Sequence, residues 1–508
     1  MIVKPVQPSP EQLAALQRRT ALWAELELLG DPRTVTAPED NVILDTDSYK
    51  LCHQAMYGKL GVTKSFSYIE PRIKGRQILF FGLQMWLKRL KPITHKMIDE
   101  AKAFFTAHII GGGEMFPEAD WRRVVDEFNG YPPLTIRALK EGTVVPSQNA
   151  LVTIECDVPG LAWMAAYFET TILRAVWYPT TVATKSFRIR QSLRSFVRKS
   201  SDLAVEEAVM FMYHDFGARG VSSKESAGIG GAAHIAAGSF GTDTITGALF
   251  ANTYYNSPMS AFSVFATEHS IMTMRGRAGE LQTVRDIIAT FGKGAGTIVS
   301  IVSDGYNIFD LADAYCTTLK DEILAAGIRL VVRPDSGDAV DVIIQLLKKF
   351  DAAFGSVVNS KGYKVLNVVR ILQGDGLTDV EDFVKIAEAV LAAGFSIENI
   401  VFGQGGGLLQ IVNRDDLKFA MKTCAAEVDG EWIDVFKDPV TDPGKRSKKG
   451  RLETFQNTLT GEYETLRLDS ASANDPMWVQ AMQTVWVNGV LFNETNLTDV
   501  QARSQNIA

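Results

Sequence analysis

The turn Arg333–Asp338 carries a guanidinium and two carboxylates within six residues. It follows an apolar run, residues 328–332, which is interrupted only by Arg329 and predicts a buried strand. Apolar residues then recur at helical spacing, at Val340, Ile343, Ile344, Leu346 and Leu347. Parallel α/β sheets bind ligands between a strand's carboxyl end and the next helix. Arg333 could bind a phosphate and Asp335 a hydroxyl or a metal, although a plain capped turn fits the pattern equally well.

Six further apolar segments end in polar or glycine residues in the same way. These endings are His214, Asp215, Phe216 and Arg219; Asp243; Glu268 and His269; Ser303 and Asp304; Gln373 and Asp375; and Gly405, Gly406 and Gly407. Because most of the strands precede a helix, the series predicts a closed or nearly closed α/β barrel. An open doubly wound sheet is the alternative. In either fold, the polar endings converge on one face.

His269 follows Glu268 and is expected in the same layer as Asp304 and Asp335. A histidine beside carboxylates is held in one tautomer, and it could act as an acid/base or as a nucleophile that accepts a phosphoryl group. His214 is a second candidate, and a purely structural role stays open for both. No HxH or HExxH spacing indicates zinc. Mg²⁺ shared between aspartates and substrate phosphates fits the residue types better.

Two stretches could bind an anion. FGQGGGLLQ, residues 402–410, combines a strand end, three glycines and a predicted helix start, which suits a phosphate unless it is only a flexible turn. Arg414, expected one or two turns into that helix, could reach the same anion or lie on the surface. The basic loop 437–451 could neutralise a diphosphate, although a solvated charge run or a localisation signal would look the same.

The positions of these elements divide the chain. Residues 1–40 predict a helical extension, and residues 181–419 the barrel. Short strand patterns in residues 41–180 and 420–508 predict one smaller mixed sheet domain built from both ends of the chain. Within it, Asn41–Lys50 reads as a strand with polar residues at its end. Leu161–Val197 reads as two helices divided at Pro179.

Composition excludes several classes. The 508 residues are 46% hydrophobic and carry a net charge of −7, which is typical of a globular protein and disfavours non-specific nucleic-acid binding. No apolar run is long enough to span a bilayer, and no apolar leader is present. The four cysteines are scattered, which favours reduced thiols in a cytoplasmic protein.

At these residues the chain resembles the nicotinamide phosphoribosyltransferase family, from about Asn41 to Arg451. The matching stretches are TDSYK, HDFGARGVSSKESAGIG, GTDT, FATEHS, VSDGY, RPDSG, QGDG, FGQGGGLLQ and VFKDPVTDPGKRSKKGR. The resemblance implies a type II phosphoribosyltransferase fold, an irregular α/β barrel, in a homodimer with active sites at the interface. It implies transfer of phosphoribosyl from 5-phosphoribosyl 1-diphosphate to nicotinamide in NAD salvage. The implied products are nicotinamide mononucleotide and diphosphate, with Mg²⁺ as cofactor and ATP as co-substrate.

The resemblance also assigns roles to single residues. Phe216 and the partner subunit's Tyr49 would sandwich the pyridine, with Asp243 accepting the carboxamide N–H and Asp47 nearby. Arg219 would contact both the ring pocket and the ribose phosphate. The implied phosphoribosyl and diphosphate ligands are Asp304, Asp335, Arg333, Gly374, Asp375, Gly405, Gly406, Arg414, Arg72, Lys422, Lys437 and Lys445, some of them across the dimer. His269 resembles a histidine that ATP phosphorylates to drive the reaction.

Some positions depart from the animal pattern of this family. Ala218 stands where an aromatic residue is common, and Gln404 where a small residue is usual.

Three other functions stay open. They are a nicotinate phosphoribosyltransferase of the same fold, an extracellular binding role, and a barrel lyase or aldolase. The last would need a Schiff-base lysine at a strand end, whereas these strands end in aspartate, histidine and arginine.

Overall fold

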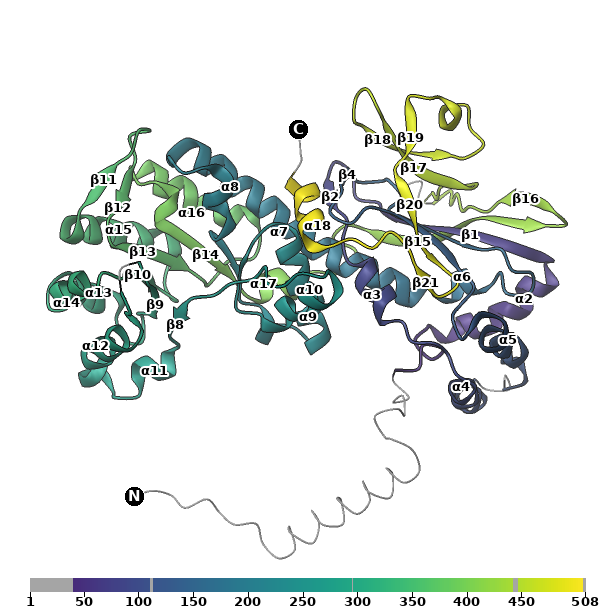
Figure 1. The fold of residues 1–508 in the computed structure, drawn as a ribbon, viewed down its shortest axis with the longest axis horizontal. Helices are drawn as coiled ribbons and strands as arrows, with labels where there is room; N and C mark the ends of the chain where they lie inside the picture. The colour runs from purple at the N-terminus through teal and green to yellow at the C-terminus, as the bar shows by residue number, and fades with distance from the viewer. Residues whose placement is uncertain (1–39, 110–112, 295, 442–445, 506–508) are drawn as a thin grey trace, which may run out of the picture.

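The computed structural model describes residues 40–109, 113–294, 296–441 and 446–505. Two lobes lie next to each other along the long axis of the molecule (Figure 1). One is built on a parallel sheet and the other on an antiparallel sheet. The helix expected within residues 1–40 lies outside the described residues.

The parallel sheet has seven strands in the order β7-β6-β14-β13-β10-β9-β8. Their bounds are β6 (Tyr213–Asp215), β7 (Gly241–Thr242), β8 (Phe265–Ala266), β9 (Ile298–Val302), β10 (Arg329–Arg333), β13 (Val369–Gln373) and β14 (Ile400–Gln404). One segment joins its two edges. Phe262 pairs with Gly241, and a few residues later Phe265 pairs with Val299 of β9. The predicted irregular barrel is therefore confirmed, with a short irregular segment linking β7 to β8.

Helices cover the outside of this sheet. They are α8 (Val205–Met210), α9 (Lys224–Ala236), α10 (Ile245–Tyr254), α11 (His269–Thr273), α12 (Glu280–Phe291), α13 (Ile308–Cys316), α14 (Lys320–Ala326), α15 (Ala339–Phe354) and α16 (Val380–Ala392). In α15, Ile343, Leu346 and Leu347 are buried, as their spacing predicts, and Asp338 caps the first turn through the Asp341 amide at 3.0 Å. No helix in the described part of the chain is both long and apolar enough to cross a bilayer.

The second lobe contains a seven-stranded antiparallel sheet drawn from both ends of the chain. Its order is β16 (Glu431–Asp434), β15 (Phe419–Val428), β1 (Val62–Pro71), β5 (Val152–Cys156), β3 (Thr135–Leu139), β20 (Met482–Val487) and β21 (Val490–Leu491). β18 (Tyr463–Arg467), which was expected in this sheet, instead pairs with β17 (Leu452–Asn457), beside β19 (Trp478–Gln480), in a separate three-stranded sheet. The boundaries of the domains along the chain stay a prediction.

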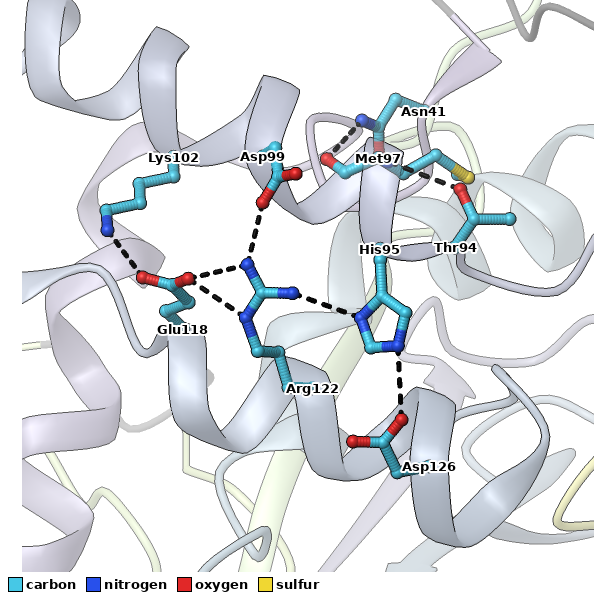
Figure 2. A network of polar contacts seen from close by, with 9 residues as sticks. All are labelled: Asn41, Thr94, His95, Met97, Asp99, Lys102, Glu118, Arg122 and Asp126. Atoms are coloured by element: carbon cyan, nitrogen blue, oxygen red, sulfur yellow. Dashed lines mark hydrogen bonds and ion pairs between the residues drawn. The ribbon is translucent and has the colours of Figure 1, made fainter.

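The α4 and α5 helices of this lobe, His95–His108 and Glu118–Phe128, are joined by surface charges (Figure 2). The Arg122 guanidinium donates to Glu118 at 2.7 Å, to Asp99 at 2.7 Å and to Nδ1 of His95 at 3.1 Å. These side chains remain in contact with solvent, with Arg122 36% and Glu118 29% exposed, so each pair contributes little stability alone. The network orients two helices and lies in the lobe without the parallel sheet.

Two further sequence expectations are wrong. Asn41–Lys50 forms turns and the start of the 3₁₀ helix η2 (Ser48–Cys52) rather than a strand, because the Asn41 side chain bonds both Met97 O and the Ile43 amide. Pro179 does not divide two helices, since α7 (Glu169–Ser200) continues through it.

The proline is accommodated by its neighbours. Gly82, at a φ of +112°, leaves room for the Pro179 ring, where a Cβ would lie 2.2 Å from the ring carbon Cγ. The Thr181 hydroxyl donates to Trp177 O at 2.6 Å, which satisfies a carbonyl of the same turn. As a result α7 runs through both hydrophobic cores, with Ile172 in the antiparallel lobe and Phe187 in the parallel one.

Candidate active site

The carboxyl ends of the parallel strands share one edge, here called the rim. Seven predicted site positions lie within three residues of the ends of these strands: Phe216 after β6, Asp243 after β7, His269 after β8, Asp304 after β9, Asp335 after β10, Asp375 after β13 and Gly405 after β14. Residues separated by up to about 190 positions in the chain therefore face one region.

Arg333 is the centre of one group at the rim. Its guanidinium donates to Asp335 Oδ1 from Nε at 3.0 Å and from a terminal nitrogen at 2.8 Å. Its Cζ atom lies 5.7 Å from the centre of the Phe216 ring. A Cβ at Gly374 would lie 3.3 Å from Nε of Arg333, so the glycine keeps this space open. An anion bound here would share Arg333 with Asp335.

The Phe216 ring lies directly on the β14 backbone. The Phe216 amide donates to Gln404 O at 2.9 Å, and a Cβ at Gly403 would lie 2.0 Å from a ring carbon. Only glycine at position 403 allows the ring this position. The ring is half-buried, so part of it is open to a flat ligand.

His269 and Asp304 form the second group. His269 Nε2 lies 2.9 Å from Asp304 Oδ1, and the Asp304 side chain is only 7% exposed while that of His269 is 49% exposed. A neutral imidazole that donates from Nε2 to this carboxylate carries its lone pair on Nδ1. Glu268, also expected to flank the histidine, instead accepts from the Ser270 hydroxyl.

His214 is held by the fold instead. Its Nε2 lies 2.9 Å from Phe211 O, burial lowers its pKa, and its ring packs against Gly241, where a Cβ would come within 2.5 Å. These contacts give His214 a structural role.

Asp243 lies next to Phe216 because β6 and β7 pair in register, Asp215 with Thr242. Its carboxylate is exposed and accepts from the Ser263 hydroxyl. Arg219, on the short helix η4 (Ala218–Gly220), is also exposed and follows Phe216 by three residues.

Asp215 is a residue to which the sequence alone assigned no role. It is fully buried, its Oδ1 accepts from the Gly217 amide at 2.7 Å, and its backbone oxygen accepts from the Asp243 amide at 2.9 Å. Burial raises the pKa of Asp215 to about 6. The sequence placed Asp215 only among the polar endings of the strands, with no role of its own.

The glycine loop opens a helix of only four residues, α17 (Gly406–Leu409). Its value to an anion lies in backbone amides rather than in a helix dipole. Arg414 lies beyond this helix, not on it as expected, and pairs with Asp415 at 3.2 Å on the surface. Gln404 is fully buried and bonds Tyr213, Leu377 O and Thr378 O, so it does not shape the pocket.

The remaining predicted residues lie in the antiparallel lobe. Arg72, Lys422 and Lys437 form a cationic cluster, and the pKa of Lys422 is lowered by burial and by its charged neighbours Arg72, Lys437 and Lys50. The Arg72 Nε atom is buried without a hydrogen-bond partner. Lys445 lies outside the described residues.

Tyr49 and Asp47 are in this lobe as well. Tyr49 is 61% exposed on η2, and Asp47 accepts from the Thr170 hydroxyl at 2.9 Å. The α2 helix (His53–Lys59) that follows η2 lies far along the molecule from β14 (Figure 1). A single chain therefore does not bring Tyr49 to Phe216.

The residue types at the rim indicate which metal ion could bind there. In the described residues, no three His, Cys, Asp or Glu side chains are grouped to hold an ion without help. Carboxylates with substrate oxygens suit Mg²⁺, which takes few protein ligands. Asp335 and Asp375, which follow the neighbouring strands β10 and β13, are carboxylates of the rim that could share an ion with substrate oxygens.

Comparisons with known proteins agree with this geometry. Residues 211–489 match the model of the "Nicotinate phosphoribosyltransferase (NAPRTase) family", and residues 41–136 match "Nicotinamide phosphoribosyltransferase, N-terminal domain". The chain is 46% identical, over 92% of its length and 98% of the relative's, to a nicotinamide phosphoribosyltransferase from Xanthomonas campestris. It is 31% identical, over 90% and 95% of the two lengths, to one from Acinetobacter baylyi.

The fold agrees with a solved structure. The crystal structure of a nicotinate-nucleotide pyrophosphorylase from Pyrococcus furiosus aligns with a TM-score of 0.59 at 17% identity, over 94% of this chain and 99% of that one. The chain thus shares the fold of that protein.

Proposed function

The chain belongs to the nicotinamide phosphoribosyltransferase family, and we propose that its rim joins nicotinamide to 5-phosphoribosyl 1-diphosphate. The products are nicotinamide mononucleotide and diphosphate, as in NAD salvage. The observation that carries the choice of base is the exposed Asp243 carboxylate beside the Phe216 ring. It can accept the carboxamide N–H of nicotinamide and repels the carboxylate of nicotinate.

The base would stack on the Phe216 ring, with the partner's Tyr49 on its other face and the partner's Asp47 nearby. Arg219 would contact the ring and the ribose phosphate. Stacking directs the pyridine nitrogen at C1 of the ribose, which is a positioning effect. The fit of Phe216 to Gly403 supports this, because it fixes the plane of the ring.

The phosphoribosyl group would lie across the rest of the rim. Asp304, Asp335, Asp375 and the amides of Gly374, Gly405 and Gly406 would hold the ribose and its 5′-phosphate, with Arg333 and Arg414 alongside. The C1–O bond to diphosphate breaks ahead of attack, leaving positive character on the ribose. The cationic cluster and Lys445 of the partner stabilise the leaving diphosphate. Asp335 and Asp375 would hold Mg²⁺ together with substrate oxygens, and the ion would supply neutralisation of the charge on that group.

We also propose that ATP phosphorylates His269. Nδ1 attacks the γ-phosphorus, the bond from that phosphorus to the β–γ bridging oxygen breaks, and ADP leaves. Asp304 keeps the proton on Nε2 and stabilises the charge that develops on the ring. The exposure of His269 supports this assignment, because an exposed ring is accessible to a bulky phosphoryl donor.

A homodimer would complete the site. Large apolar side chains are exposed near the rim, on α10 and in the segment before α11: Ile245 at 74%, Leu249 at 54%, Met259 at 52% and Phe265 at 50%. Others are exposed around Tyr49 in the second lobe, Met56 at 51% and Leu60 at 60%. Such patches suit a protein interface, and pairing these surfaces would bring Tyr49 to the partner's Phe216. A monomer in sedimentation equilibrium would contradict this.

We place the enzyme in the cytoplasm, which its four free cysteines support. A nicotinate phosphoribosyltransferase is the alternative. The test is to incubate the protein with phosphoribosyl diphosphate, Mg²⁺ and equal nicotinamide and nicotinate, with and without ATP. We expect the amide mononucleotide to dominate and ATP to increase its yield. Formation of the acid mononucleotide alone would select the alternative.

A further inference from the structure

Glu169 contacts both parts of the antiparallel lobe that the proposed function assigns to the site. It is the first residue of α7, and its side chain is 28% exposed. One carboxylate oxygen, Oε2, accepts from Lys50 Nζ at 2.8 Å. The other, Oε1, lies 3.8 Å from Lys422 Nζ. Glu169 is not among the residues that the proposed function places in the site.

The Lys50 contact leads to Tyr49. The Lys50 side chain is only 4% exposed, and its ammonium also donates to Ala166 O at 2.8 Å. The same ammonium lies 5.5 Å from the centre of the Tyr49 ring. A buried ammonium depends on its carboxylate partner, so Glu169 fixes Lys50 and through it the backbone and ring of Tyr49.

The Lys422 contact leads to the cationic cluster. Lys422 Nζ donates to Met421 O at 2.6 Å and is repelled by Arg72, Lys437 and Lys50, while Glu169 attracts it. Glu169 is the carboxylate that holds Lys422 and Lys50 close together despite their like charge.

We propose that Glu169 is a positioning residue that couples the Tyr49 ring to the cationic cluster. Bound diphosphate attracts the Lys422 ammonium and so changes the interaction of Lys422 with Glu169. The change reaches Tyr49 through Lys50, and so alters the affinity for the base. The inference rests on the proposed function, because Tyr49 and Lys422 are ligand contacts only under that function.

The test measures linkage and needs no turnover. Calorimetry gives the Kd of nicotinamide for the full-length protein, alone and with saturating inorganic diphosphate. We expect the two Kd values to differ by at least about fivefold in the wild type, as coupled sites do. Glu169→Gln should bring that ratio to one, with thermal unfolding confirming that the variant is folded.

Two further variants make the result decisive. The double variant Lys50→Met with Glu169→Gln removes the ion pair without leaving a buried charge. It replaces the single variant if that variant fails to fold, and it should also give a ratio of one. Glu427→Gln is the control. It breaks an ion pair 2.9 Å long between Lys64 and Glu427, which lies on β15 as Lys422 does, and it should keep the wild-type ratio.

The outcomes separate the inference from the function. A wild-type ratio of one, or a ratio unchanged in the folded Glu169 variants, would overturn the coupling while leaving the reaction intact. A wild type that binds neither nicotinamide nor diphosphate would overturn both the proposed function and the coupling.

Discussion

Replacing Gly403 by alanine should displace the Phe216 ring without touching a charged group. The added methyl would lie 2.0 Å from the nearest ring carbon, whereas carbon atoms in contact are about 3.5–4.0 Å apart. The ring must therefore move by about 1.5–2 Å. Gly403 has no positive φ, so alanine is compatible with the strand backbone. The primary clash is thus with the Phe216 ring, whose atoms are the three nearest to the added methyl.

The size of the effect follows from the stacking that is lost. Stacking of a base on an aromatic side chain contributes about 1–3 kcal/mol, which corresponds to about 5- to 150-fold in affinity. We expect Gly403→Ala to raise the KM for nicotinamide by about that factor and to leave the KM for phosphoribosyl diphosphate within about twofold.

Steady-state kinetics with each substrate varied in turn measures both values. In a Phe216→Ala background the ring is absent, so Gly403→Ala should add nothing further, and this double variant is the control. A folded Gly403→Ala protein with the wild-type KM for nicotinamide would refute the placement of the base on Phe216.

Three further predictions address other groups at the rim. Asp243→Ser should lower the nicotinamide-to-nicotinate ratio of kcat/KM by about tenfold or more, because it removes the charge that repels the acid; an unaltered ratio would count against that role. His269→Ala should lose ATP hydrolysis and ATP stimulation but keep the reaction without ATP, and full ATP coupling in this variant would exclude the phosphohistidine. Because burial raises the pKa of Asp215 from 3.8 to about 6, the folded chain binds this proton more tightly than the unfolded chain. This group therefore lowers the free energy of unfolding by about 3 kcal/mol as pH rises from about 4 to above 6. In denaturant titrations, the free energy of unfolding of Asp215→Asn relative to the wild type should therefore rise over that pH range. If the free energies of unfolding of the two proteins change equally with pH, the carboxyl is not buried.

The parallel lobe was predictable because its signals are local. Each strand is a short apolar run with a polar ending, and parallel pairing then forces the endings onto one edge. The contact of His269 with Asp304 follows from that edge alone. The amphipathic spacing of α15 likewise settled its position.

The failures were cases where distant residues overrule local preference. Pro179 should break a helix, but Gly82, nearly 100 positions away in the chain, makes room for its ring. Asn41–Lys50 has a strand-like pattern, but the contact of Asn41 with α4 turns the chain. The coupling through Glu169 links three distant segments, and nothing in their sequences indicates that they meet.

The central claim is that the rim of one subunit and the Tyr49 lobe of another make one site for nicotinamide mononucleotide synthesis. Subunits carrying Phe216→Ala and subunits carrying Tyr49→Ala should each form poorly active homodimers. When the two are co-expressed, half of the dimers are mixed and each holds one intact site, so mononucleotide formation should recover to about a quarter of the wild-type rate. No recovery in isolated mixed dimers, or no mononucleotide from the wild type, would contradict the account.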